Sequence, residues 1–244
     1  MFWFLLSRRW VLFFVFVVAL GAACWRLGVW QFDRLAETKA ENAVIERNLA
    51  APSVPATQVM GVDHPLEAQM YRHVSATGTY DMADETLVRY QTRNGRPGVE
   101  VLTPLDTVQG STVLVDRGWM PTTNDPKAHV DAPDPASGQV TVTGWAVPDD
   151  EGDAEDFTPI QGETRLVSSR GFTDVVQGPV LHGYIAALNE TPAPAKALAD
   201  PLPPDLSNGP HFFYGLQWWF FAALAVGGFG YFAYLESQER RRRT

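Results

Sequence analysis

Two long apolar segments, one near each end of the 244-residue chain, constrain the fold more than any other feature. Residues 10–30 contain a single charged side chain, Arg26, and residues 211–235 contain no Asp, Glu, Lys or Arg. A helix of roughly 20 apolar residues spans the hydrocarbon core of a bilayer. The sequence therefore predicts two transmembrane helices, residues 10–30 and 211–235, with Arg26 reaching toward the membrane surface.

The flanking charges predict the orientation of these helices. Two arginines precede the first segment and four follow the second. Basic flanks remain on the cytoplasmic side of a membrane. We therefore predict cytoplasmic ends, residues 1–9 and 236–244, and an extracytoplasmic domain, residues 31–210. Arginine is far commoner than lysine, which favours a bacterial plasma membrane. Together with the two spans, this predicts a multi-pass protein of that membrane with both termini in the cytoplasm.

A cleaved signal peptide is the alternative interpretation of the first segment. Residues 20–24 resemble a lipoprotein cleavage box, although the apolar core continues without a clear small-residue cleavage site. Cys24 is the only cysteine, so an intrachain disulfide is excluded. The predicted outer domain has 26 acidic and 12 basic residues between Asp33 and Asp205. This charge argues against nucleic-acid binding, which needs a basic surface.

The middle of the chain contains short alternating runs that are rich in β-branched residues, the pattern of half-buried strands. These runs are residues 72–80, 86–93, 99–105, 112–119 and 139–147, with 165–168 and 180–188 as further candidates. Asn94-Gly95 has the composition of a hairpin turn. We predict a mainly antiparallel β (α+β) domain, as a sheet or small barrel, between the two transmembrane helices. The first helix should continue to about Asn48, before Pro52.

Two stretches of the domain have irregular composition. Residues 148–156 are acidic and do not fit the calcium-loop pattern, because Gly152 as the sixth position would place Val147 first. We predict a solvated loop there. Residues 190–210 are rich in Pro and Ala, which indicates a semi-extended strap that leads into the second apolar segment.

The motifs of several enzyme classes are absent from the sequence. It has no G-x-S-x-G, Walker A, G-x-G-x-x-G, H-E-x-x-H or C-x-x-C motif. Four histidines of the outer domain lack the spacing of metal ligands: His64, His73, His129 and His182. A catalytic triad could still form from distant residues, but no pattern favours one. We therefore expect a protein that is not an enzyme.

The segment that opens the second helix combines unusual polar and aromatic side chains. Pro210 suits the first turn of a helix, and His211, Tyr214 and Trp218 then fall on one face, with Gln217 on a neighbouring face. A neutral imidazole can ligate haem iron, and aromatic neighbours provide an apolar wall. Gly215 would leave space for a flat ligand or a close helix. The alternative is an interfacial aromatic belt without a ligand.

The end of the first apolar segment carries a second candidate group, Trp30, Gln31 and Arg34. A structural interpretation is an aromatic belt that leads into an amphipathic helix. A functional one is a polar collar facing His211, in which Arg34 or Arg26 pairs with propionates. A third motif, Arg117-Gly118-Trp119, is predicted to be structural, with Arg117 paired to an acidic neighbour.

Taken in order, these segments resemble the Surfeit locus protein 1 family of cytochrome c oxidase assembly factors, and the resemblance covers nearly the whole chain. The motifs that carry it are Gly28-x-Trp30-Gln31-x-x-Arg34 with Lys39, Tyr71-Arg72-x-Val74 with Gly78-x-Tyr80, Val101-Leu102-Thr103-Pro104-Leu105, Val113-Leu114-Val115-x-Arg117-Gly118-Trp119, Val140-x-Val142-x-Gly144 and Gly209-Pro210-His211-x-x-Tyr214-x-x-Gln217-Trp218. Asp116 departs from the family, whose members often have asparagine there.

The resemblance implies a bacterial factor for an aa3-type oxidase that binds haem A transiently and helps deliver it to the haem–copper subunit. His211 is then the implied iron ligand, with Tyr214, Gln217, Trp218, Trp30, Gln31 and Arg34 around the cofactor. The implied partners are oxidase subunit I, haem A synthase and the lipid bilayer, with no nucleic acid. The alternative is a cofactor-free scaffold that stabilises an oxidase intermediate, and an extracytoplasmic enzyme is a third hypothesis.

Overall fold

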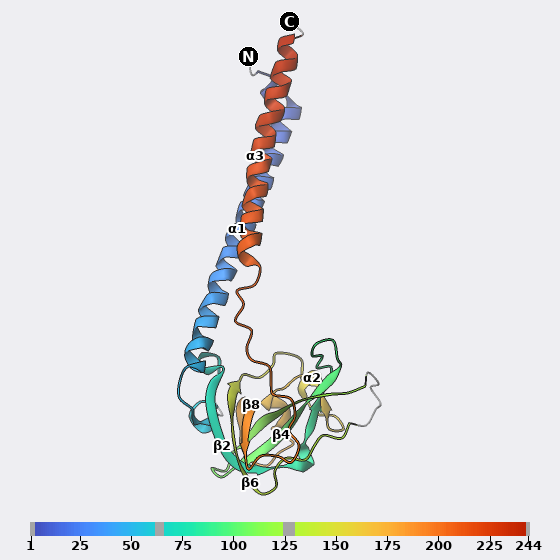
Figure 1. Ribbon diagram of the computed structural model, residues 1–244. Helices are drawn as coiled ribbons and strands as arrows, with labels where there is room; N and C mark the ends of the chain where they lie inside the picture. The colour runs from blue at the N-terminus through green and yellow to red at the C-terminus, as the bar shows by residue number, and fades with distance from the viewer. Residues whose placement is uncertain (1–2, 62–65, 124–129, 243–244) are drawn as a thin grey trace. The chain divides into compact units, whose positions relative to one another are not determined.

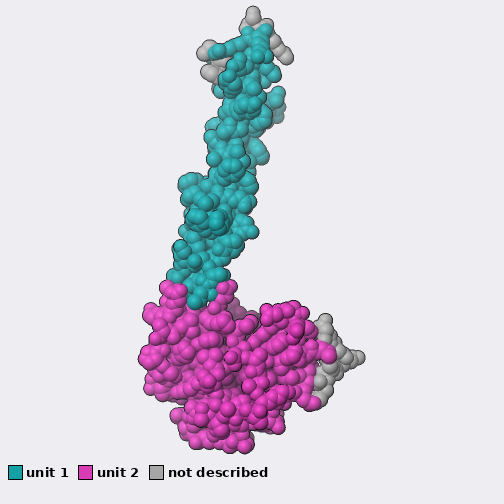
Figure 2. Space-filling model, in the orientation of Figure 1, with its two compact units in different colours: residues 1–42, 206–244 teal, residues 43–205 magenta. Residues whose placement is uncertain are grey.

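The computed structural model describes residues 3–61, 66–123 and 130–242 (Figure 1). Two histidines of the sequence analysis, His64 and His129, and the last arginine, Arg243, lie outside the described residues. The chain divides into two compact units, residues 1–42 with 206–244, and residues 43–205 (Figure 2). We call them the helix unit and the barrel unit and describe each by itself.

The helix unit is built from the two apolar segments. After a short helix, η1 (Trp3–Leu6), comes α1 (Arg8–Leu49), and the chain ends with α3 (His211–Arg242). The predicted continuation of the first helix to about Asn48 is confirmed, since α1 ends at Leu49, before Pro52. The helix α3 begins directly after Pro210, whose carbonyl accepts a hydrogen bond from the Tyr214 N–H at 3.2 Å. Both helices are long and apolar enough to cross a membrane.

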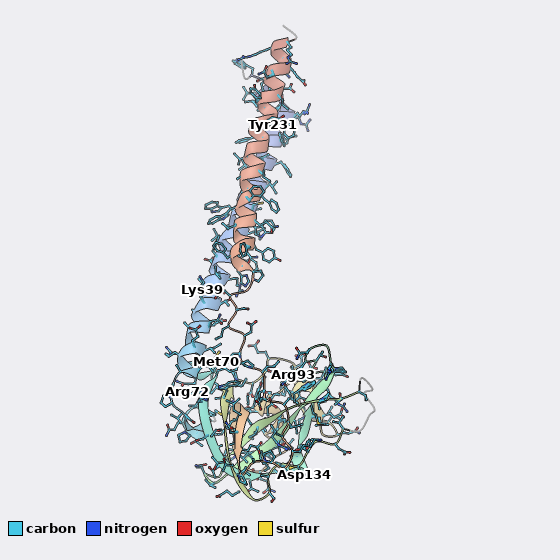
Figure 3. All side chains as sticks on the ribbon, viewed as in Figure 1. Lys39, Met70, Arg72, Arg93, Asp134 and Tyr231 are labelled. Carbon is cyan, nitrogen blue, oxygen red and sulfur yellow. The ribbon has the colours of Figure 1, made fainter. Side chains whose placement is uncertain are left out.

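Ring contacts show that α1 and α3 run antiparallel. Trp10 meets Phe229 with ring centroids 5.6 Å apart, whereas Trp25, further along α1, stacks on Trp219 at 5.1 Å, further back along α3. Other side chains project outward along both helices (Figure 3). In the most apolar 18-residue windows, only 17% of α1 and 0% of α3 are buried. The two helices therefore bury little of their apolar surface against each other.

The barrel unit contains one eight-stranded sheet in the order β1-β2-β6-β8-β5-β4-β3-β7 (Figure 1). An additional pairing, β2 with β4, closes β2, β6, β8, β5 and β4 into a five-stranded barrel. The strands are β1 (Val54–Pro55), β2 (Arg72–Tyr80), β3 (Thr86–Val88), β4 (Gly98–Thr107), β5 (Thr112–Pro121), β6 (Gln139–Val147), β7 (Glu163–Thr164) and β8 (Val180–Thr191). The short helices are η2 (Ala56–Gln58), η3 (Glu67–Gln69), η4 (Met82–Asp84), α2 (Ala154–Phe157) and η5 (Ser169–Phe172).

The sheet is mixed, which refines the predicted antiparallel domain. Within the described residues, five strand pairings are antiparallel and three are parallel, namely β1–β2, β3–β7 and β5–β8. The two predicted strands 72–80 and 139–147 match β2 and β6 in both bounds. The run 86–93 forms a strand only to Val88, because Tyr90 adopts a positive φ of 66°.

The candidate strand 165–168 is wrong. The backbone N–H groups of Arg165 and Leu166 both bond to the Asp156 carbonyl instead of a strand neighbour. The strand of this region is β7, two residues earlier, where Glu163 and Thr164 pair with β3. At the predicted turn, Asn94 and Gly95 both have positive φ, 51° and 74°, between the bridged residues 93 and 96. That turn is confirmed.

The barrel has a regular apolar interior. Val74, Val113, Val142 and Ile185, from four neighbouring strands, are fully buried in one cluster. Alternate residues of the same wall, including Leu102 and Leu114, form a second cluster outside the barrel with Phe172 and Val176. Both faces of β4 and β5 are therefore covered, so these strands are apolar in nearly continuous runs rather than in strict alternation.

A glycine allows the close backbone approach that barrel closure requires. Gly78 pairs with Thr107 of β4 on one side and with Val140 of β6 on the other. A Cβ at this position would lie far inside van der Waals contact with the Asp106 carbonyl oxygen. A small residue is therefore needed where β2 changes partners.

The two irregular stretches differ from each other in their packing. The prediction of a solvated loop at residues 148–156 is wrong for Asp149 and Asp150. The Asp149 carboxylate accepts hydrogen bonds from the Ser169 N–H at 2.6 Å and from the Ser169 hydroxyl at 2.7 Å, and Asp150 accepts one from the Val167 N–H at 2.8 Å.

Residues 192–208 contain no helix or strand, as expected for a strap. Within this segment, Ala199 is bridged to Trp119 by two backbone hydrogen bonds.

Candidate functional site

A hydrogen bond between α1 and α3 is the central feature of the candidate site. His211, the first residue of α3, has its Nδ1 atom 2.9 Å from Oε1 of Gln31 on α1. The two residues are 180 positions apart in the chain, and both lie in the helix unit. Because an amide oxygen only accepts, Nδ1 carries the proton in this arrangement, and in the neutral imidazole Nε2 then has its lone pair available.

The backbone before α3 leaves room beside the free ring nitrogen. Gly209 has a φ of 61°, a conformation that favours glycine. A Cβ at this position would lie 3.3 Å from Nε2 and 3.2 Å from Cδ2 of His211. Glycine at 209 therefore keeps one side of the imidazole unobstructed, as a ligand to Nε2 requires.

Aromatic rings pack next to this histidine and fill the space that Gly215 was predicted to leave. A Cβ on Gly215 would lie 2.7 Å from the Phe32 ring, so Phe32 occupies that space. The Phe32 ring centroid lies 4.8 Å from that of Trp219, which stacks on Trp25 at an interplanar angle of 14°. Of the two predicted uses of Gly215, the geometry corresponds to close helix packing rather than to a slot for a flat ligand.

Trp219 of α3 packs directly against Gly28 of α1. Its indole lies where a Cβ of Gly28 would be, so α1 can approach only because residue 28 is glycine. The indole Nε1 is buried and has no hydrogen-bond partner within the part of the chain that the structure describes. Trp25 and Phe32 are seven residues apart on α1, and this two-turn spacing is the sequence signal that could have identified the ring cluster.

The other predicted site residues lie around this centre without a described hydrogen bond to His211. On α3, Tyr214 and Gln217 are exposed, and Trp218 is half-buried against Phe221, with centroids 6.0 Å apart. On α1, Trp30 is exposed, with the Arg34 guanidinium 6.0 Å from its ring centroid. The structure thus joins Gln31 directly to His211. Of the other five predicted residues, it leaves Trp218 half-buried and the remaining four exposed on the helices.

The arginine predicted to bind propionates has an acidic partner of its own. Arg34 bonds to Glu37 at 2.8 Å, one turn further along α1, and both side chains are more than half exposed. Such a pair contributes about 0–1 kcal/mol. Arg34 could therefore exchange Glu37 for another carboxylate at little cost.

The residues present fit an iron porphyrin better than a free metal ion. The described residues contain no group of three or more His, Cys, Asp or Glu side chains that could hold a metal. A porphyrin supplies four nitrogen ligands itself, so a single histidine with a free Nε2 is sufficient. Of the predicted donors, only His211 offers such a nitrogen beside an unobstructed approach.

Among the described residues of the barrel unit, Ser169, Asp149 and His182 lie close together, but their order does not suit catalysis. Ser169 donates directly to Asp149 at 2.7 Å, and His182 Nδ1 lies 3.9 Å from the same carboxylate. A triad requires the imidazole between the nucleophile and the carboxylate. Here the carboxylate lies between the other two, and Ser169 is buried.

The Arg117-Gly118-Trp119 motif forms part of a buried polar network. Arg117 donates to Glu85 at 2.8 Å and to the Pro133 carbonyl at 2.6 Å, which confirms the predicted acidic neighbour. Asp116, on the opposite face of β5, accepts from the Gly118 N–H at 2.9 Å. Burial, with a further contribution from the Glu100 carboxylate, raises the pKa of Asp116 to about 7. Sequence patterns did not reveal this buried acid.

The chain has a long apolar helix at each end and a closed, mixed β-barrel between them in the sequence. A hydrogen bond to Gln31 orients His211 between the two helices. These features define a class of small β-barrel proteins with two apolar helices. The SURF1 family model matches residues 18–223 of this chain. Since the match covers most of the sequence, the chain belongs to the SURF1 family, which is generally linked to the assembly of cytochrome oxidase.

Bacterial relatives agree with this membership. SURF1-like proteins of Mycobacterium bovis and Mycobacterium tuberculosis are each 34% identical over 246 residues, covering 98% of this chain and 89% of theirs. A SURF1-like protein of Rickettsia felis is 29% identical over 101 residues, covering 40% of this chain and 42% of its own. The similarity to the mycobacterial proteins extends over both apolar helices as well as the barrel.

Proposed function

We propose that this protein is an assembly factor for an aa3-type cytochrome c oxidase that binds haem A transiently through His211. The single observation that supports the site is the 2.9 Å hydrogen bond between His211 Nδ1 and Gln31. Family membership supports the wider role in oxidase assembly. In this proposal the protein receives haem A from its synthase and delivers it to oxidase subunit I, and it is not itself an enzyme.

The proposal places α1 and α3 across a bacterial plasma membrane, with both termini in the cytoplasm and the barrel unit outside. The exposed apolar side chains along both helices support this placement, because lipid can cover them. The arginines at residues 8–9 and 240–242 support the orientation. The histidine then lies at the outer membrane boundary, where an amphiphilic cofactor can enter from the bilayer.

The chain's own residues orient the ligand. Gln31 accepts a hydrogen bond from the Nδ1–H group of His211, which fixes the tautomer and the ring plane. Haem A would supply an iron that His211 could hold through Nε2. Trp30 and Trp218 would provide apolar surface, and Arg34, Tyr214 and Gln217 would face the polar edge of the cofactor. A single histidine ligand gives modest affinity, which suits a protein that must release its cargo.

The test is the haem A content of protein purified in detergent from cells that make haem A, measured by absorption spectrum and pyridine haemochrome. We expect His211→Ala to lose at least about 90% of the haem, because the iron then has no ligand from the proposed site. Gln31→Leu should retain the ligand but bind about tenfold more weakly, in line with the loss of an orienting partner. His182→Ala, on the barrel, is the matched control and should bind haem A as the unmodified protein does.

A cofactor-free scaffold is the second candidate, and the filled space under Gly215 favours it. In that case wild-type protein would contain no haem A but would still co-purify with oxidase subunits. Haem A that remained in folded His211→Ala protein would remove this residue from the site.

A further inference from the structure

The helix unit contains a cavity at the end of α1 and α3 that is far along both helices from His211. It has a volume of about 460 Å³, within the roughly 300–1,000 Å³ range of small-molecule sites. Residues 9, 10 and 13 of α1 line one side, and residues 232, 235, 236 and 239 of α3 line the other. The α3 residues recur at intervals of three and four, so they form one continuous face of that helix.

One part of the cavity is apolar and largely aromatic. Phe13 of α1 and Phe232 of α3 meet across it with ring centroids 6.2 Å apart, and Trp10 lies 5.9 Å from Phe13. Leu235 completes this wall. Such a surface suits hydrocarbon chains, and tryptophan is a common residue at membrane interfaces.

The other part of the cavity combines one guanidinium with two carboxylates. Glu236 accepts a hydrogen bond from Arg240 at 2.9 Å through one oxygen, which leaves its second oxygen available. Arg9 and Glu239 form no hydrogen bond or ion pair with any residue that the structure describes. Opposite charges that lack partners in one cavity favour a ligand that carries both a phosphate and a cation.

We propose that this cavity binds one phospholipid with a phosphoethanolamine headgroup. The phosphodiester would pair with Arg9, whose planar donors match phosphate oxygens. The primary ammonium, with three donors, would bond to Glu239 and Glu236. The acyl chains would lie along Trp10, Phe13 and Phe232. This inference rests on the proposed function only in placing the helices in a membrane, and it makes no use of haem.

The charges of the cavity select among headgroups. Phosphatidylglycerol would bring a phosphate but no cation for the two carboxylates. Phosphatidylcholine carries a cation, but its quaternary nitrogen has no N–H to donate. We therefore expect affinity to fall from ethanolamine through its mono- and dimethyl derivatives to choline, as donors are removed one by one.

The experiment is native mass spectrometry of the delipidated, detergent-solubilised full chain, titrated with dioleoyl lipids of these headgroups. We expect one phosphatidylethanolamine to bind about tenfold more tightly than phosphatidylcholine or phosphatidylglycerol. Equal binding of all three, or a preference for phosphatidylglycerol, would overturn the proposal. This series needs no variant, so misfolding cannot obscure it.

Substitutions then assign the preference to residues. Glu239→Gln should abolish the preference for ethanolamine over choline, and Arg9→Gln should weaken both lipids about tenfold. Arg8→Gln and Glu41→Gln change charges of the same helix unit outside the cavity and should bind as the unmodified chain does. A Glu239→Gln protein that kept the preference would refute the assignment. Haem A content measured on the same samples shows whether a change in lipid binding occurs without a change in haem binding at His211.

Discussion

The helix unit and the barrel unit are stabilised in opposite ways. Along α1 and α3 most of the large apolar side chains face outward, and in the apolar window of α3 no residue is buried. In the barrel, Val74, Leu105, Val115 and Ile185 are fully buried. The charged groups follow the same division, because the Arg34–Glu37 pair of α1 has side-chain exposures of 55% and 57%, whereas those of the Arg117–Glu85 pair are 2% and 17%.

This difference supports the proposed placement, in which the helix unit folds in lipid and the barrel unit in water. In the barrel, water drives apolar side chains inward, and buried charges must then be paired. Between two helices in lipid there is no such driving force, so close contact depends on small residues and on ring packing. Gly28 against Trp219 and Gly215 against Phe32 are the points where this happens. The same kind of substitution should therefore change the stability of the two units by different amounts.

The largest expected contrast concerns the two ion pairs. Arg117→Leu removes the buried partner of Glu85, and within the described residues Glu85 then keeps only the hydrogen bond from the Thr103 hydroxyl at 3.0 Å. We expect it to lower the free energy of unfolding by about 3–5 kcal/mol, the cost of stranding a buried charge. Glu37→Gln breaks the exposed pair on α1 and should change the free energy of unfolding by less than about 1 kcal/mol.

Thermal unfolding of the full chain in detergent, followed by near-UV circular dichroism, measures both changes. The double variant Arg117→Leu with Glu85→Leu should recover part of the loss, since it leaves no unpaired carboxylate. Equal effects of Arg117→Leu and Glu37→Gln would contradict the division of the molecule into two differently stabilised units.

A smaller contrast is expected for glycines. A Cβ at Gly144 in β6 would overlap the Ala186 carbonyl oxygen of β8, and the paired backbone cannot move aside. Gly144→Ala should therefore lower the free energy of unfolding by about 1–3 kcal/mol. Gly227 of α3 has no atom within 4 Å of such a Cβ, so Gly227→Ala should be neutral or stabilising by up to about 1 kcal/mol. The same unfolding assay tests both variants. A destabilised Gly227→Ala protein would contradict the expectation that the Gly227 position faces open space.

The sequence was sufficient to predict both long helices and six of the eight strands, but not the short strands β1 and β7 or the way in which the barrel closes. Alternation and turn chemistry located β2 and β6 because these strands have one buried and one more exposed face. The parallel pairing of β5 with β8 could not be read from such patterns, since it joins strands about 70 residues apart. Strand β3 ended early because Tyr90 takes a left-handed conformation that its residue type does not signal.

For the candidate site, the sequence predicted the two groups of residues and their approach, but not the contacts within them. Helical spacing and the Gly-Pro-His motif selected His211, and the polar collar that was to face it contained Gln31. Which member of the collar would reach the imidazole depends on the rotation of α1, and Phe32 and Trp219 determine that rotation by filling the spaces over Gly215 and Gly28. Ring packing of this kind has no strong sequence signal apart from the seven-residue spacing of Trp25 and Phe32.

The smallest expected effect is the pH dependence of stability that comes from Asp116, a buried acid of the barrel unit. Since burial raises its pKa from 3.8 to about 7, the unfolded chain releases this proton at lower pH than the folded chain does. The stability contributed by the protonated carboxyl is therefore complete below about pH 4 and is lost as the pH rises toward 7. Asp116→Asn keeps the acceptor for the Gly118 N–H and should be more stable than the unmodified protein at pH 8 by about 1–2 kcal/mol, with little difference at pH 4. Unfolding measured across this range, with the exposed Asp174→Asn as control, tests the sign, and a variant that lost stability at pH 8 would show that the charged carboxylate is needed beside Arg93.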